Sequence, residues 1–213
     1  MQLTKFTHAC VRLDDGDRSL VIDPGVFSET QAALDGAAVV LITHEHADHL
    51  DADAVRARAK QDSRVRIYAP SSVTSTLADL GDQVVAVEPG QQFEAEGFSV
   101  RTYGGQHAVI HLSIPVIANV AYLVDDAIYH PGDSFTVPDA PVGTLLLPTN
   151  APWSKVSEVI DFAIAVRAAR AFQVHDSLIT PIATGMIEGH IERITAPFGT
   201  HFQHLDAMQT VTL

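Results

Sequence analysis

The stretch from Thr43 to Asp51 concentrates side chains that can bind metal ions. Three histidines and an aspartate fall within six residues: His44, His46, Asp48 and His49. Neutral imidazole is a good ligand for zinc, iron and related ions, whereas a carboxylate suits harder ions and can help to hold a second one. Four such groups on so short a stretch predict a site with more than one metal ion. The alternative interpretation is a solvated, histidine-rich turn.

The neighbouring sequence predicts rigid elements on both sides of these ligands. The apolar run Val39 to Ile42 is typical of a buried strand, and it ends where the ligands begin. Asp51 to Lys60 then predicts a helix, whose acidic start and basic end suit the helix dipole. Between them, Ala47 lets the backbone turn, so that the first two histidines can share one ion while the next two ligands face a neighbouring one.

The spacing His44-x-His46-x-Asp48-His49 resembles the signature of the metallo-β-lactamase superfamily of metal-dependent hydrolases. The resemblance spans essentially the whole chain. It looks closest to the small bacterial hydrolases grouped near the ascorbate-6-phosphate lactonases and N-acyl-phosphatidylethanolamine phospholipase D. This implies an α/β protein in the form of an αββα sandwich, with two packed β-sheets flanked by helices, and a single domain over residues 1–213.

A two-metal hydrolytic site needs about seven protein ligands, so three more are required. His107, Asp133 and His175 are the candidates, because each follows a predicted strand. The glycines before His107 allow a close backbone approach, and the resemblance favours His107 over His111. Asp133 matches the family's Gly-Asp-Ser element, and a carboxylate can bridge two ions about 3.5 Å apart. The alternative for Asp133 is an acidic turn residue, and His130 is expected to be a neighbour rather than a ligand.

The resemblance thus implies a complete two-metal site. The ligands divide into three sets: His44, His46 and His107 on the first metal, Asp48, His49 and His175 on the second, and Asp133 as the bridge. Zinc is the expected ion, with manganese or iron as alternatives, because histidine and carboxylate ligands admit all three. A metal-bound hydroxide would be the nucleophile, since the pKa of a bound water falls to near 7. Asp48 is the expected catalytic residue, steering the proton.

Two further residues are expected to support the ligands from outside. Asp23 ends the predicted strand from Ser19, and it either orients a ligand histidine or caps the Pro24-Gly25 turn. His8 is placed on a first strand within residues 2–13, as a core or rim histidine or as a residue near the cleft.

The segment Thr149 to Lys155 is the predicted substrate-facing loop. Trp153 would form a wall, and Lys155 would hold an anion together with a helix capped by Ser154. The alternative is a packed tryptophan and a solvated lysine.

The remaining elements alternate between strands and helices along the chain. Strands are predicted at 64–69, 83–87, 91–95, 98–103, 120–124, 127–129, 144–147 and 171–174, helices at 71–80, 154–168 and 181–196, and a closing strand at 201–213.

Composition narrows the class of protein. Of the 213 residues, 46% are apolar and 18% charged, which is enough for one substantial core and argues against disorder. The net charge is −13 with only 13 lysines and arginines, so long nucleic acid is an improbable partner. The apolar region from Ala108 to Val124 contains polar residues and proline, which excludes a membrane span. No secretory signal is visible, and Cys10, the only cysteine, is expected to be a packed thiol, so a cytoplasmic location is predicted.

These features predict a binuclear metal-dependent hydrolase that acts on a small anionic ester, lactone or phosphodiester. The alternatives are a nuclease of the same superfamily and a catalytically idle binding or sensor domain that retains its metals. The expected partner is a small-molecule substrate, while its identity and the oligomeric state stay open.

Overall fold

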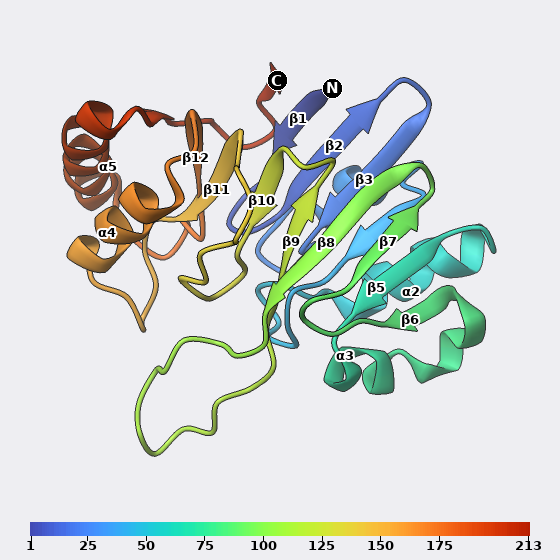
Figure 1. Ribbon diagram of the computed structural model, residues 1–213. Helices are drawn as coiled ribbons and strands as arrows, with labels where there is room; N and C mark the ends of the chain where they lie inside the picture. Colours follow the sequence, from blue (N-terminus) through green and yellow to red (C-terminus); the bar gives the residue numbers. More distant parts are fainter.

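Two seven-stranded mixed sheets pack face to face in the computed structural model, which describes residues 1–213 (Figure 1). The first sheet has the order β14-β1-β2-β3-β4-β5-β6 and consists of β1 (Gln2–Lys5), β2 (Val11–Asp15), β3 (Arg18–Ile22), β4 (Val39–Leu41), β5 (Arg66–Ala69), β6 (Val84–Ala86) and β14 (Thr210–Thr212). The second has the order β13-β12-β11-β10-β9-β8-β7 and consists of β7 (Gln92–Ala95), β8 (Phe98–Gly104), β9 (Val120–Val124), β10 (Ile128–His130), β11 (Thr144–Pro148), β12 (Arg170–Val174) and β13 (His201–Gln203).

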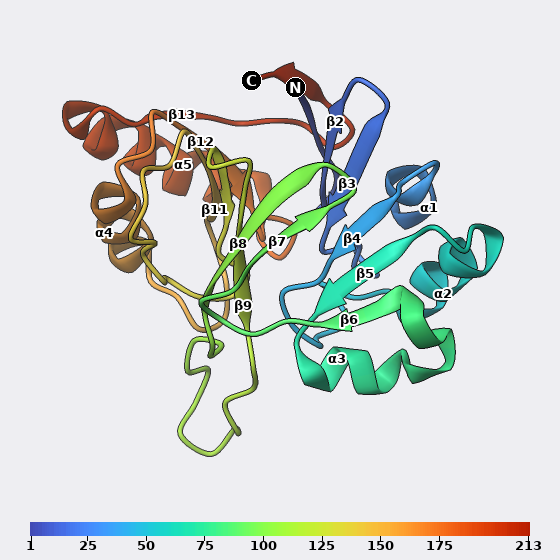
Figure 2. The same cartoon turned by 45° about the vertical axis from the view of Figure 1, so that its right-hand side comes forward.

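Helices cover the outer face of each sheet (Figure 2). The first sheet carries α1 (Thr30–Leu34), α2 (Ala52–Gln61), α3 (Ser71–Thr76) and the 3-10 helix Ala78–Gln83. The second carries α4 (Val156–Val166), α5 (Pro181–Thr195) and the 3-10 helix Ala196–Phe198. The predicted αββα sandwich is therefore confirmed. None of these helices combines the length and the apolar character that crossing a lipid bilayer requires.

Burial on both faces explains why β4 and most of β11 are apolar. In β4, Val39 and Leu41 join the core between the sheets, whereas Val40 packs under the helices with Leu34 and Val55. Residues of β11 divide in the same way between the inner core and the layer beneath α4 and α5. A strand buried on both faces has no position at which a polar side chain could reach water, so its sequence reads as a continuous apolar run.

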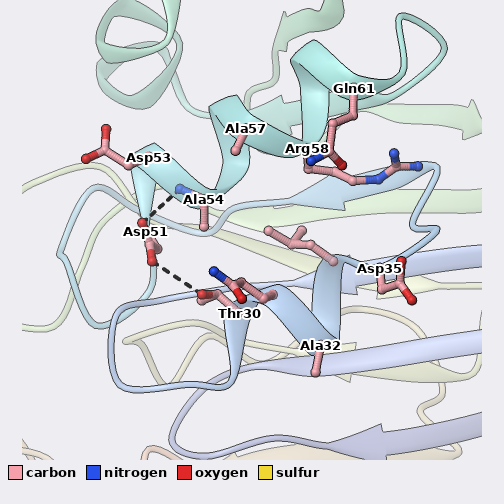
Figure 3. A pocket seen from close by; sticks show the side chains of 11 residues that line it. Thr30, Ala32, Asp35, Asp51, Asp53, Ala54, Ala57, Arg58 and Gln61 are labelled. Carbon is pink, nitrogen blue, oxygen red and sulfur yellow. Dashed lines mark hydrogen bonds between the residues drawn. The ribbon is translucent and has the colours of Figure 1, made fainter.

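The helix after the ligand loop, α2, is held at its N-terminus by its N-cap residue. Asp51 is the N-cap of α2, and its side chain accepts a hydrogen bond from the backbone N–H of Ala54 at 3.0 Å. The hydroxyl of Thr30, at the start of α1, lies 3.3 Å from the same carboxylate (Figure 3). A hollow of about 850 Å³ between these two helices contains none of the seven predicted metal ligands, so it lies apart from the candidate chemistry.

The structure corrects the predicted N-terminal strand. Residues 2–13 form two strands rather than one, because β1 and β2 pair antiparallel with Lys5 opposite Val11. The turn between them closes with a hydrogen bond from the N–H of Phe6 to the carbonyl of Cys10 at 2.9 Å. His8 therefore lies in a turn and has a left-handed φ of 66°. Cys10 is a fully buried thiol, as predicted.

Two predictions about the second half were also wrong. The segment 201–213 is not one strand, since β13 pairs with β12 while β14 crosses to the first sheet and pairs with β1. Ser154 does not cap the next helix, because α4 begins at Val156 with Lys155 as its N-cap, and the backbone N–H of Lys155 donates to the side chain of Glu158 at 3.0 Å. The short helix α1 was not predicted, and the helix predicted at 71–80 gives way to a 3-10 helix after Thr76.

A buried tyrosine joins the two sheets next to the ligand loop. The hydroxyl of Tyr122, on β9, donates to the carbonyl of Ile42 at 2.9 Å and lies 3.2 Å from that of Tyr68. We expect Tyr122→Phe to lower the free energy of unfolding by about 1–3 kcal/mol, because a buried carbonyl loses its donor. Urea denaturation measures this, with Tyr68→Phe as control, whose half-buried ring stacks on Phe93. Equal effects of the two substitutions would contradict this role of Tyr122.

Candidate metal centre

All seven predicted ligands lie at one end of the two sheets. His44, His46, Asp48 and His49 occupy the loop that follows β4. The others follow strands of the second sheet: His107 after β8, Asp133 after β10 and His175 after β12. Loops at the carboxyl ends of strands place side chains precisely because the strands behind them are rigid. The structure therefore brings together residues from four segments of both sheets.

The ligand atoms form two groups, each with all its members within 4.8 Å of one another. The first group consists of His44, His46, His107 and Asp133, and the second of His8, Asp48, His49 and His175. The carboxylate of Asp133 lies between them, with Oδ1 3.1 Å from Nε2 of His49 and Oδ2 3.2 Å from Nε2 of both His107 and His175. The histidines and Asp48 fall into the two sets expected from the sequence, but His8 joins the second set and Asp133 is grouped with the first.

The atoms that converge here fit divalent metal ions. Nε2 of His49, Nε2 of His107 and Oδ1 of Asp133 are buried and have no hydrogen-bond partner. Nε2 of His49 and Nε2 of His107 lie 3.1 Å and 3.2 Å from the carboxylate oxygens of Asp133. This is about the separation of two ligand atoms that bind the same ion at roughly 2.0–2.1 Å. Leaving such polar atoms buried and unpaired is costly unless a cation lies between them. The donor set of imidazoles and carboxylates therefore suits two divalent ions.

Asp23 controls the ligand loop through three hydrogen bonds. Its carboxylate accepts from the backbone N–H and the hydroxyl of Thr43, both at 2.7 Å, and lies 2.7 Å from Nδ1 of His49. Since Nδ1 of His49 donates to a carboxylate, its Nε2 is left free to face the second group. The side chain of Asp23 thus contacts Thr43 and a predicted ligand rather than capping the Pro24-Gly25 turn.

The other ligand histidines are oriented in the same manner. Nδ1 of His107 lies 2.6 Å from the carbonyl of Ala108, and Nδ1 of His175 lies 2.7 Å from the carbonyl of Asn150. A carbonyl can only accept, so each Nδ1 carries a proton, and in the neutral form of each ring Nε2 presents a lone pair to the site. These carbonyl partners could not be predicted from the sequence, because every residue has a backbone carbonyl.

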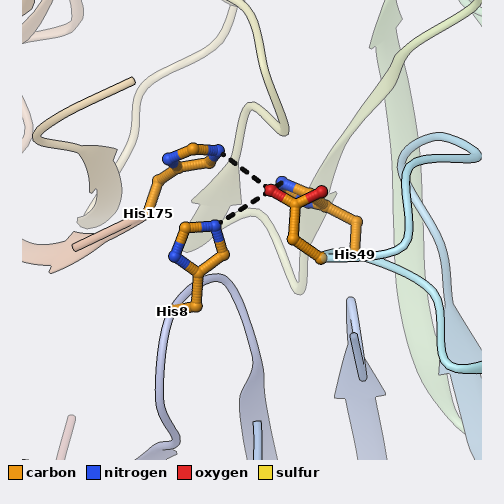
Figure 4. Close-up of side chains that lie close together, drawn as sticks. His8, His49 and His175 are labelled. Atoms are coloured by element: carbon orange, nitrogen blue, oxygen red, sulfur yellow. Dashed lines mark hydrogen bonds and ion pairs between the residues drawn. The ribbon is translucent and has the colours of Figure 1, made fainter. Parts of the chain in front are cut away.

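The contacts of His8 define which of its nitrogens carries the proton. The backbone N–H of Ser177 donates to Nδ1 at 3.4 Å, and the Ser177 hydroxyl lies 2.8 Å from the same atom. Nδ1 is therefore the acceptor, and Nε2–H donates to Oδ2 of Asp48 at 3.1 Å (Figure 4). Burial lowers the pKa of His8, which agrees with a neutral ring. In this arrangement His8 holds Asp48 instead of offering a lone pair to an ion.

Two glycines let the loops approach one another. A Cβ on Gly25 would lie 1.9 Å from the carbonyl oxygen of Asp48, and one on Gly132 would lie 2.3 Å from Oδ1 of Asn119. The side chain of Asn119 donates to the carbonyl of Pro131 at 2.9 Å and accepts from the N–H of Asp133 at 3.0 Å. It therefore fixes the turn that presents Asp133.

Of the predicted substrate residues, the structure places only Trp153 at the site. Its Nε1–H donates to Oδ2 of Asp133 at 2.9 Å, and its ring lies edge-on to that of His107 with centroids 6.0 Å apart. Lys155 is 79% exposed and pairs with Glu158, three residues on in the first turn of α4.

Two histidines that were not expected to bind metal, His111 and His130, lie away from the ligand atoms. His111 is exposed and contacts Ser113. His130 is buried, with Nε2 3.0 Å from the carbonyl of Ala9 and Nδ1 accepting from the N–H of Gly132 at 3.1 Å. It is thus a neighbour that supports the Gly132 turn, as predicted.

The carboxylates determine the protonation of two ligands in the metal-free chain. Burial opposes a charge on His49, but Asp133 and Asp23 outweigh it and raise the pKa of His49 well above its usual range. Burial also opposes a charge on His175, yet contact with Asp133 and Asp48 raises the pKa of His175 to about 9. Conversely, the pKa of Asp133 is well below its ordinary value, since the neighbouring histidines overcome the effect of burial.

Binding of divalent ions should therefore release protons. Only neutral imidazole binds a metal, so the protons on His49 and His175 must leave. The apparent affinity should therefore fall as the pH falls below the His175 pKa of about 9. Calorimetric titration with zinc at neutral pH, in two buffers of different ionisation enthalpy, measures the release. The variant His111→Ala should behave like the unchanged chain, and a binding enthalpy independent of the buffer would contradict the prediction.

Comparisons with known proteins agree with this architecture. Residues 2–175 match the family described as "Beta-lactamase superfamily domain". Protein Rv0786c of Mycobacterium tuberculosis is 38% identical over 217 residues, covering 100% of both chains. A UPF0173 metal-dependent hydrolase of Azorhizobium caulinodans is 31% identical over 119 residues, or 51% of this chain and 50% of that protein.

Solved structures share the fold. Igni18, a metallo hydrolase from Ignicoccus hospitalis, superimposes with a TM-score of 0.77 at 17% identity, covering 99% of this chain and 97% of that one. The match to the family over most of the chain and the relative that spans its whole length lead to one conclusion. The chain belongs to the metallo-β-lactamase superfamily, together with metal-dependent hydrolases, as its histidine-rich loop predicted.

Proposed function

We propose that this protein is a binuclear metal-dependent hydrolase that cleaves a small anionic ester, lactone or phosphodiester. The observation that carries the proposal is the carboxylate of Asp133, which lies within 3.2 Å of a histidine from each group. The proposed ligands are His44, His46 and His107 for one ion, Asp48, His49 and His175 for the other, and Asp133 for both. Zinc is the proposed ion, since imidazole predominates among the ligands.

The two ions would polarise the scissile carbonyl or phosphoryl oxygen and lower the pKa of a water molecule at the site. The chain's own residues would supply orientation and proton transfer. Asp48 is the proposed proton acceptor, because its side chain is 20% exposed whereas Asp133 is only 4% exposed and Asp23 is fully buried. Burial opposes its ionisation, but contacts with His175 and His8 hold the pKa of Asp48 far below its usual range, so it is a carboxylate at neutral pH.

Trp153 is the better supported of the two proposed substrate contacts. Its indole touches Asp133, whereas the ammonium group of Lys155 pairs with Glu158 at 3.3 Å. The acidic surface also supports a small substrate over a polynucleotide, because a polyanion would be repelled along its length by a net charge of −13.

The proposal is tested by metal content and turnover together. Chain reconstituted with zinc should bind two ions, and it should hydrolyse at least one of an aryl ester, a lactone and an aryl phosphodiester. A stable content near one ion per chain would contradict the binuclear site. Salt-sensitive cleavage of single-stranded RNA, with the small substrates untouched, would indicate the nuclease instead. Two bound ions without turnover of any substrate would indicate a binding domain.

Substitution of a proposed ligand and of a nearby exposed histidine distinguishes metal ligands from residues that do not bind metal. We expect His107→Ala to reduce the metal content and to lower kcat/KM at least 100-fold, because a buried ligand is lost. His111→Ala, at an exposed histidine four residues further on, should leave both unchanged. Asp133→Asn keeps the size of the side chain but removes its charge, and it should weaken the binding of both ions. Loss of only one ion in Asp133→Asn would contradict the bridging role.

His8 is proposed to position Asp48 rather than to bind metal. His8→Ala should lower kcat by about 10- to 100-fold, with little change in KM, because an outer partner of the reacting carboxylate is lost. His8→Gln should recover part of this loss, since the amide can still donate to Asp48. Both variants should keep two ions, as measured by metal analysis. Loss of one ion in both variants would make His8 a ligand instead.

A further inference from the structure

Three separate segments that carry apolar side chains adjoin residues of the candidate metal centre. The first segment is Val26 and Phe27, in the connection after β3. The second is the loop from Ala108 to Val116, between β8 and β9, and the third is Trp153, just before α4. None of these three segments contains a lysine or an arginine. Together they are called the apolar rim below.

Two members of the apolar rim touch residues of the centre directly. The ring of Phe27 is edge-on to His8, with centroids 5.3 Å apart, and 46% of Phe27 is exposed. The indole of Trp153 donates to Asp133 and also lies edge-on to the ring of His175, with centroids 6.4 Å apart. An aromatic side chain is thus available beside each of the two ligand groups.

The loop from Ala108 to Val116 begins one residue after the ligand His107. Its two limbs pair through a hydrogen bond from the N–H of His107 to the carbonyl of Ile117 at 3.0 Å, and the N–H of Ala108 donates to the carbonyl of Asp133 at 2.8 Å. Beyond this base the loop extends past the ends of the sheets, as the light-green segment of Figures 1 and 2 shows.

The side chains of this loop are unusually apolar for their exposure. Five of its nine residues are exposed hydrophobics: Val109, Ile110, Leu112, Ile114 and Val116. Leu112 is 96% exposed. Exposed apolar side chains grouped beside a polar site are typical of a ligand-binding region, where a few polar groups fix the reacting bond and apolar contacts hold the rest.

Lys5, close in sequence to His8, and Lys155, close to Trp153, each form an ion pair. Lys5 is buried and pairs with Asp176 at 3.3 Å, and Lys155 pairs with Glu158. The three segments of the apolar rim add no lysine or arginine to these two. We therefore expect apolar contacts to bind the part of the substrate outside the scissile bond.

We propose that the substrate carries an apolar group, an alkyl, acyl or aromatic moiety of several carbons, which binds against the apolar rim. This inference rests on the proposed hydrolase function and specifies its substrate class. The polar head of the substrate would face the two ligand groups, and its apolar part would lie against Phe27, Trp153 and the base of the loop at Val109 and Ile110. Each methylene that becomes buried should strengthen binding by about fourfold, until the rim is covered.

Trp153 allows the binding step to be measured without turnover, because it is the only tryptophan in the chain. Zinc-loaded protein is titrated with alkylphosphonates from methyl to octyl while the tryptophan fluorescence is recorded. The dissociation constant should fall by about two- to fourfold per added methylene over the first members of the series. In parallel, kcat/KM is measured for aryl esters with acyl chains of the same lengths.

A matched pair of variants tests the loop. The double variant Val109→Ser with Ile110→Ser should flatten the dependence on chain length in both measurements. Ile182→Ser, at an exposed apolar residue near the start of α5, should leave the dependence as it is in the unchanged chain. Circular dichroism and metal content confirm that the variants are folded and loaded.

The outcomes distinguish the inference from the function on which it rests. A dissociation constant independent of chain length would overturn the inference, even if the esters are hydrolysed. A clear dependence on chain length without any hydrolysis would support the apolar rim and count against the hydrolase. Light scattering and sedimentation with neutral lipid vesicles are run on the same double variant. If it changes the oligomeric mass or vesicle binding but leaves the chain-length dependence intact, the loop contacts another copy or a lipid surface, and the inference fails.

Discussion

The carboxylate of Asp23 is the interaction on which the rest of the centre depends. It is fully buried, it follows β3, and it holds both ends of the ligand loop through Thr43 and His49. The Thr43 hydroxyl donates to Asp23, so it accepts from Nδ1 of His44 at 2.9 Å and turns Nε2 of that histidine toward the first group. One side chain thus orients a histidine in each group. Removing it would leave several buried donors without an acceptor, which is far more costly than losing a single exposed contact.

The centre also depends on the way the two sheets meet. The ligand loop belongs to the first sheet, while His107, Asp133 and His175 belong to the second. Two backbone hydrogen bonds connect the sheets here. The N–H of Val120 donates to the carbonyl of Thr43 at 2.9 Å, and the N–H of His175 donates to the carbonyl of His8 at 3.1 Å. The distance between the ligand groups is therefore set by the packing of the core between the sheets. Close-packed cores are stiff, so this distance is fixed before any ion arrives.

Much of this arrangement could be predicted from the sequence, because the decisive signals are local. The apolar run before the ligand loop, the four clustered ligands and the polar residue after each later strand are readable without a structure. The contacts of His8 are not, since Ser177 and Asp48 lie 169 and 40 positions away. A left-handed residue other than glycine leaves no mark in the sequence either, as His8, Asp23 and His175 show. The sequence also predicted one strand after residue 200, where the structure has two. A strand of three residues is too short for its pattern to indicate which sheet it joins.

The positions of the ligands along the chain give the centre an order of assembly during synthesis. The first group is complete once Asp133 has left the ribosome, but the second requires both His8 and His175. Contacts between distant parts of a chain form late, because the entropy of closing the intervening loop must be overcome first. All residues of the first group have therefore been synthesised while the second group still lacks His175. Since Asp133 belongs to the first group, the side chain that lies between the two groups is synthesised before the last member of the second group.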